Sequence, residues 1–99
     1  MAKVIFTIVY EINEEKREEY LALSQEMKAH IAGVRGKNYS IYEQKGKKNN
    51  FVEVFLCDSR EEYDQLEDDQ DEKTETLINR LEDMIVNGKM KYTTLLEMD

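Results

Sequence analysis

The sequence predicts one α+β domain whose elements follow the order β-α-β-β-α-β. Three observations lead to this fold class. Apolar residues alternate with a period of two in several segments, they recur every three to four residues in others, and Gly or Asn clusters separate these segments. With 99 residues the chain has the length of a single domain, so residues 1–99 are treated as one unit.

The first two elements are a strand over Lys3–Ile12 and a helix over residues 14–32. The strand is rich in β-branched and aromatic residues and is apolar on both faces, so we expect it to be buried on both sides. Asn13 is expected to cap the helix by accepting a backbone N–H. Gly33 and Gly36 then end the helix. Its apolar stripe consists of Tyr20, Leu23, Met27 and Ile31.

A β-hairpin is expected next, with strands over Lys37–Lys45 and Phe51–Cys57 joined by Gly46–Asn50. Because side chains alternate along a strand, the second of these strands has two different faces. One face carries Val52, Val54 and Leu56. The other carries Phe51, Glu53, Phe55 and Cys57.

The last third of the chain predicts a short helix, a break, a longer helix and a strand. Ser59–Glu62 match the capping-box pattern that begins a helix. Residues 67–72 contain no apolar side chain and predict a break or an exposed turn. Asn87–Gly88 would end the longer helix, and Lys89–Met98 would form the fourth strand. The helical stripe consists of Leu77, Ile78, Leu81, Met84 and Ile85.

This order is that of the ferredoxin-like fold, an antiparallel sheet with helices on one face. Right-handed crossovers place both helices on the same side, which leaves the other face of the sheet uncovered. We expect that open face to carry Ile5, Val9, Phe51 and Phe55. A surface this apolar usually marks an interface, so we expect a homodimer in which two sheets cover each other.

Charge and composition exclude several classes of partner. The formal net charge is −8, and the cluster Lys45–Lys48 lies on the predicted hairpin tip, so we expect no nucleic-acid partner. No segment approaches the ~20 apolar residues of a membrane span, and no export signal follows Met1. Cys57 is the single cysteine and cannot form an intramolecular disulfide. Together these features predict a cytoplasmic protein without a membrane partner.

Two segments resemble a known family. Tyr10–Tyr20 is similar to the opening strand and helix of the antibiotic-biosynthesis-monooxygenase-like branch of the dimeric α-β barrel superfamily. Phe51–Tyr63 looks like that family's third strand and second helix. There a Glu is commonly followed two residues later by an aromatic side chain, as Glu53 is by Phe55. This chain has Phe55 where Trp is usual.

The resemblance implies a small homodimer that binds a small organic ligand in a cavity between sheet and helices, of unassigned function. The alternative is a cofactor-independent monooxygenase-like enzyme. Haem-degrading members of the family use a helix His, an Asn and a Trp. This chain has no Trp, and Leu66 stands near the position of that His. We therefore expect no cofactor.

Glu53 is the candidate catalytic residue. A carboxylate in an apolar cavity has a raised pKa and can act as a general acid or base. The other interpretation is a structural Glu at an interface or a cavity mouth. The candidate ligand-binding residues are Tyr39, Tyr42, Phe55 and Tyr92. Tyrosines also simply fill half-buried sheets, because they combine apolar area with a polar tip.

His30 and the acidic stretch Glu61–Glu75 have simpler interpretations. His30 lies near the end of the first helix, where capping or a surface role is expected. No second His or Cys stands at ligand spacing, so no metal site is expected. The acidic stretch lacks the register of a calcium loop and is expected to be a solvated helix or turn.

Overall fold

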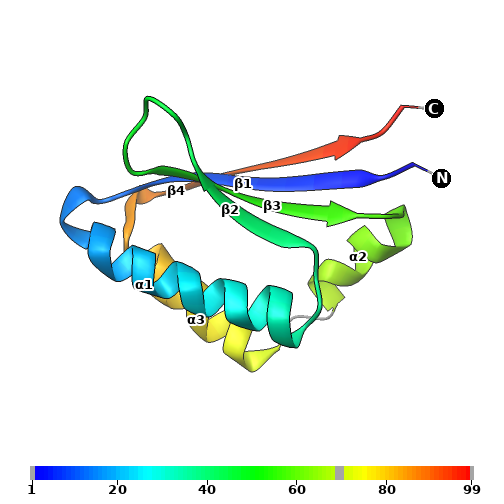
Figure 1. The fold of residues 1–99 in the computed structure, drawn as a ribbon, viewed down its shortest axis with the longest axis horizontal. Coiled ribbons are helices and arrows are strands. Elements are labelled where there is room, and N and C mark those ends of the chain that lie inside the picture. The colour runs from blue at the N-terminus through cyan, green and yellow to red at the C-terminus, as the bar shows by residue number, and fades with distance from the viewer. Residues whose placement is uncertain (1, 69–70, 99) are drawn as a thin grey trace.

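The computed structural model describes residues 2–68 and 71–98 and shows a four-stranded antiparallel sheet with the helices on one face (Figure 1). The strands are β1 (Val4–Ile12), β2 (Tyr39–Glu43), β3 (Asn50–Cys57) and β4 (Ile85–Leu96), and they lie in the order β2-β3-β1-β4. The central strand β1 pairs antiparallel with both β3 and β4. The predicted α+β, ferredoxin-like fold is therefore confirmed.

The first predicted helix is present but changes geometry along its length. A 3₁₀ turn (η1, Glu14–Lys16) leads into α1 (Arg17–Lys28), which continues as a π-helical segment (η2, Ala29–Val34). The predicted Asn13 cap is wrong, because the Asn13 side chain accepts no cap hydrogen bond. Its amide instead donates to the Met84 carbonyl oxygen over 3.3 Å and ties the start of this helix to the far end of the chain.

The second helical region consists of α2 (Arg60–Asp68) and α3 (Glu72–Glu82). As predicted, Ser59 accepts a hydrogen bond from the Glu62 backbone N–H, over 3.2 Å. The Glu62 carboxylate accepts from the backbone N–H of Asp58 rather than from that of Ser59. The predicted break falls between the two helices, and residues 69–70 lie outside the described residues. None of the helices in the described part of the chain is long and apolar enough to cross a membrane.

The boundary between the last helix and the last strand was predicted wrongly. The helix ends at Glu82, and Ile85 already belongs to β4, where it pairs with Ile12. Asn87–Gly88 does not stop a helix, since both residues have positive φ angles (56° and 63°) within the strand. The β1–β4 register shifts between Tyr10 and Ile12, as expected for a β-bulge.

The strand register determines which side chains the helices cover. Phe6 pairs with Phe55, and Ile8 with Glu53, so these residues face the helices. The prediction that Phe51 and Phe55 lie on the open face is therefore wrong, whereas Ile5 and Val9 do lie there. Alternation alone gives the two faces of each strand, but only the pairing shows which faces coincide. The open face carries Ile5, Val9, Val52, Val54, Leu56 and Leu95.

An ion pair fastens the hairpin to the start of α1. The Arg17 guanidinium donates to both carboxyl oxygens of Glu43, over 2.6 and 3.0 Å. Arg17 also donates to the Asn49 side chain, whose own backbone N–H donates to Glu43. The hydrogen bonds from Arg17 and Asn49 lower the pKa of Glu43 from its ordinary value of 4.5 to about 2.

This ion pair predicts a specific loss of stability in acid. Because the folded-state pKa of Glu43 is lowered, its contribution is present above pH 4.5 and is lost as the pH falls toward 2. In urea unfolding between about pH 5 and pH 2, Glu43→Gln should show a shallower loss than the unsubstituted protein. The exposed Glu18→Gln variant is the control and should keep the full slope. Equal slopes for the unsubstituted protein and Glu43→Gln would contradict the assignment.

Candidate functional site

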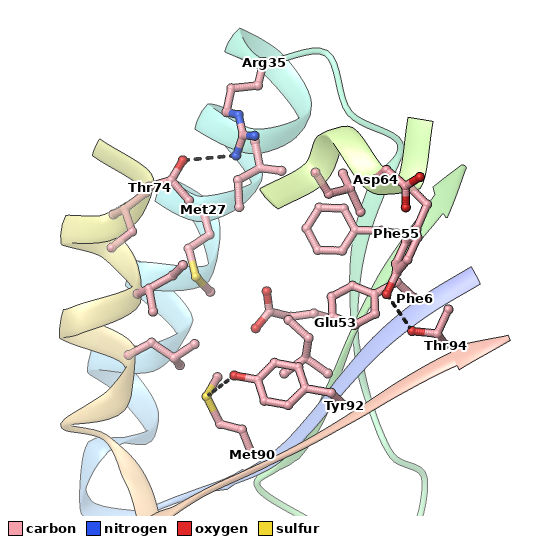
Figure 2. A pocket seen from close by; sticks show the side chains of 17 residues that line it. Phe6, Met27, Arg35, Glu53, Phe55, Asp64, Thr74, Met90, Tyr92 and Thr94 are labelled. Carbon is pink, nitrogen blue, oxygen red and sulfur yellow. Dashed lines mark hydrogen bonds between the residues drawn. The ribbon is translucent and has the colours of Figure 1, made fainter. Parts of the chain in front are cut away.

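A cavity of about 660 Å³ lies between the sheet and the helices (Figure 2). This volume is within the range of natural small-molecule pockets, roughly 300–1,000 Å³. Helices α1, η2 and α3 supply aliphatic walls, and β1 and β3 supply the aromatic floor. The walls include Met27, Ile31, Leu77 and Leu81, and the floor includes Phe6 and Phe55.

Glu53 projects from β3 into this cavity with its carboxyl group directed toward the helices (Figure 2). The side chain is only 4% exposed. One oxygen, Oε1, accepts a hydrogen bond from the Tyr39 hydroxyl over 2.6 Å. The other, Oε2, is buried and has no hydrogen-bond partner among the described residues. The carboxyl group therefore has one hydrogen-bonded oxygen and one buried oxygen without a partner among the described residues.

Burial raises the pKa of Glu53, and the hydrogen bond from Tyr39 and the nearby Tyr10 hydroxyl oppose that rise. Burial likewise raises the pKa of Tyr39 and Tyr10, and the nearby Glu53 adds to the effect. These hydroxyls therefore remain protonated donors. The Tyr10 hydroxyl also shares a 2.8 Å hydrogen bond with that of Tyr20, on α1. Two buried hydrogen bonds therefore lie close together, one within the sheet at the carboxyl group and one between the sheet and the first helix.

The four predicted ligand-binding residues do not all reach the cavity. Phe55 lines the cavity, and Tyr39 reaches the site through its hydrogen bond to Glu53. Tyr92 lines the cavity at an exposed edge, with its hydroxyl donating to the Met90 sulfur over 3.4 Å. Tyr42 pairs with an open-face residue of β3 and is 59% exposed, so it does not reach this cavity. The sheet register separates Tyr42 from the others.

Arg35, Thr74, Tyr10 and Tyr20 belong to the site or its support but were not predicted. Arg35 lines the cavity next to Thr74, and its Nη1 donates to the Thr74 hydroxyl over 3.2 Å. In the sequence Arg35 is a charged residue between two predicted turn glycines, which carries no site signal. In the sequence, Tyr10 is one of the apolar residues of a strand and Tyr20 is one of the apolar residues of a helix. Only the packing of the helix on the sheet brings the two hydroxyls together.

His30 has a structural partner rather than a surface role, so that prediction is wrong. The side chain is only 6% exposed, and its Nε2 lies 2.8 Å from the Asp71 carboxylate. Asp71 is the N-cap of α3 and accepts from the Thr74 backbone N–H over 2.8 Å. Hydrogen bonds from Thr74 and His30 hold the pKa of Asp71 well below its usual range. This contact joins η2 to α3 beside the cavity.

The remaining groups that could react or bind a metal are the Cys57 thiol and the acidic side chains. Cys57 is a free, buried thiol at the end of β3, on the helix-facing side. Within residues 2–68 and 71–98, no three His, Cys, Asp or Glu side chains gather closely enough to hold a metal ion. The cavity can therefore bind or move a proton through Glu53 and attract an anion through Arg35.

Neither a protein-family model nor a curated protein matches this sequence. Solved structures do match its fold. A conserved protein from Methanosarcina mazei Go1 superposes with a TM-score of 0.82 at 11% identity, covering 99% of this chain and 95% of its own. A NIPSNAP family protein from Agrobacterium tumefaciens reaches 0.73 at 20% identity, with 98% and 94% covered. SnoaB, a cofactor-independent oxygenase from Streptomyces nogalater, reaches 0.72 at 11% identity, with 94% and 90% covered.

These likenesses establish the ferredoxin-like α+β fold, and proteins described as antibiotic biosynthesis monooxygenases and as NIPSNAP proteins are among the structural neighbours. Identities of 11–20% say nothing about chemistry. Any function must therefore be argued from the side chains of this chain.

The buried carboxyl group predicts a decline of stability with rising pH. Because the folded-state pKa of Glu53 is raised, the folded state holds more protons than the unfolded state above 4.5. The free energy of unfolding should therefore fall as the pH rises above 4.5, and Glu53→Gln should remove much of that fall. Urea unfolding at several pH values measures this free energy for the unsubstituted protein and for the variant. Glu43 and Asp71, whose pKa values are lowered, act only below this window.

Tyr39→Phe supplies the complementary variant. It removes the donor that stabilises the ionised carboxylate, so the pKa of Glu53 should rise further and the decline should continue to higher pH. If Glu53→Gln kept the slope of the unsubstituted protein, Glu53 would not be the buried titrating group.

Proposed function

We propose that this chain is a cytoplasmic, homodimeric binding protein that takes a small, mostly apolar organic molecule into the cavity above Glu53. The observation that carries the proposal is the unpartnered Oε2 of Glu53, buried in that cavity. A buried polar atom without a partner destabilises a protein by about 1–3 kcal/mol. A ligand group that forms a hydrogen bond with Oε2 would remove that penalty, which favours the bound state.

The shape and chemistry of the cavity support a ligand of this class. Ligand pockets are mostly apolar with a few convergent polar groups. Here Met27, Leu77 and Phe55 offer apolar contact, and Glu53 offers a fixed hydrogen-bonding group. The hydrogen bond from Tyr39 fixes the orientation of that carboxyl group. Binding specificity would come from the one group of the ligand that meets Glu53.

The homodimer is supported by the open face of the sheet. No helix of the described residues covers this face, and the side chains along it are largely aliphatic. Leu56 is 44% exposed and Leu95 is 50% exposed. Packing two such faces together around a two-fold axis would bury both patches. The cytoplasmic location is supported by Cys57, a free and buried thiol, as is usual where disulfides do not persist.

The alternative is a cofactor-independent monooxygenase-like enzyme. It is supported by the raised pKa of Glu53, which suits a group that accepts or returns a proton inside an apolar site. It is also supported by the fold that this chain shares with SnoaB, a cofactor-independent oxygenase. An enzyme requires that Glu53→Gln abolishes a measured turnover while the dimer persists. A binding protein shows altered ligand affinity and no turnover.

The dimer can be tested with two matched leucines. Leu56, on the open face, and Leu21, on α1, are similarly exposed, at 44% and 42%. Leu56→Lys should weaken dimerisation at least about tenfold, because it would bury an unpaired charge in the interface. Leu21→Lys should leave dimerisation unchanged. Sedimentation equilibrium at micromolar concentration measures both, and a folded monomer for the unsubstituted protein would refute the dimer.

The cavity can be tested by filling it. Ile78 lines the cavity, so Ile78→Trp should abolish the thermal shift that a small apolar ligand produces. For the unsubstituted protein, a ligand at about 100 times its Kd should raise Tm by roughly 10–20 °C. Leu21→Trp adds a similar volume on the surface and should leave the shift intact. A broad compound screen that never shifted the unsubstituted protein would rule out the binding function.

A further inference from the structure

Arg35 brings a cation to the wall of the cavity, apart from Glu53 (Figure 2). Arg35 directly follows η2, and its backbone N–H donates to the His30 carbonyl over 2.9 Å, a five-residue step that closes the π-helical turn. The next residue, Gly36, has a φ of +67° and turns the chain toward β2. The π-helical turn and the glycine together fix where the arginine leaves the helix.

The Arg35 guanidinium is only partly satisfied. Its Nη1 donates to Thr74, but its Nη2 is buried and finds no acceptor among the described residues. Arg35 also forms no ion pair within that part of the chain. The Arg35 side chain is partly buried, and an arginine is charged, so a buried N–H without an acceptor is unfavourable here. The cavity wall therefore holds a cation that lacks an anion.

A carboxylate fits this cation better than a phosphate does. The planar fork of a guanidinium matches the two oxygens of a carboxylate. Arg35 is the sole Lys or Arg among the described residues that line the cavity, and Asp64 also lines it. A dianionic phosphate would need further cations, and Asp64 would repel it. One carboxylate is the anion that a single, partly buried arginine can neutralise.

Glu53 selects the second polar group of the ligand. A hydroxyl can accept from a protonated carboxyl group and can donate to an ionised one, so it pairs with Oε2 in either state. Between the two polar groups the cavity presents aliphatic walls, among them Met27, Ile31 and Leu77. The ligand must therefore carry an apolar body between its polar ends.

We propose that the ligand of this cavity is a hydroxylated, otherwise apolar monocarboxylic acid, with its carboxylate on Nη2 of Arg35 and its hydroxyl on Oε2 of Glu53. The proposal rests on the proposed binding function and specifies its ligand class. Thr74 is a positioning residue for Arg35, and Asp71 and His30 in turn hold the first turn of α3, which carries Thr74.

The test is calorimetric titration with a panel of aryl and alkyl hydroxy acids. Each acid is paired with its methyl ester and with its analogue lacking the hydroxyl. The unsubstituted protein should bind the acids at least about tenfold more tightly than the esters, as expected for hydrogen bonds to charged groups. Arg35→Met should abolish that preference, and Arg35→Lys should reduce it in part. Arg80→Met is the control, because Arg80 pairs with Glu26 on the surface.

Glu53→Gln addresses the other end of the ligand. It should reduce the preference for the hydroxylated acid over its analogue without the hydroxyl, and it should leave the preference for acid over ester unchanged. Thermal unfolding of each variant checks that it is folded. Arg35→Lys keeps the charge and allows the test if Arg35→Met does not fold.

The outcomes separate the two proposals. A preference for the acids that disappears in Arg35→Met and persists in Arg80→Met supports the ligand class. Esters that bind as tightly as acids, with no effect of Arg35→Met, overturn the ligand class and leave the binding function standing. If no acid, ester or analogue binds the unsubstituted protein, both proposals fail.

Discussion

The burial of one carboxyl group, that of Glu53, is the constraint on which the rest of the site depends. The antiparallel register places Glu53 opposite Ile8, beneath the helices, where water cannot solvate it. The Tyr39 hydroxyl donates to one oxygen, the other oxygen is buried without a partner in the described residues, and the side chain lines a cavity. Because nearly all buried polar groups in proteins are hydrogen-bonded, the unpartnered oxygen makes this position unusual.

Two carboxylates of neighbouring strands show how location determines chemistry. Glu43 of β2 lies at the rim, where Arg17 favours its ionised form, and it links the hairpin to α1. Glu53 of β3 lies inside, where burial favours its protonated form. The first contributes stability to the fold, and the second reduces it, because a buried carboxyl group with an unpartnered oxygen is unfavourable. Buried groups with shifted pKa values that lower the stability of the fold are common at functional sites.

The order of the elements could be predicted from the sequence because strand and helix periods differ clearly, and Glu53 could be selected because a carboxylate alternated with aromatic residues. The face of the sheet could not be assigned for Phe51 and Phe55, because alternation fixes faces within a strand but not between strands. Ile85 fits a helical stripe as well as a strand, so the start of β4 was missed. Arg35 could not be selected because its place in the cavity depends on a turn geometry that no residue spacing signals.

The π-helical turn at Ala29–Val34 has a consequence for how such a protein could diverge. A π turn holds one residue more than an α turn, because its hydrogen bonds span five residues rather than four. Deleting one residue here would convert the π turn to an α turn and leave the residues on either side of it nearly in place. The chain can therefore lose one residue at this turn while the sheet and its register stay as they are.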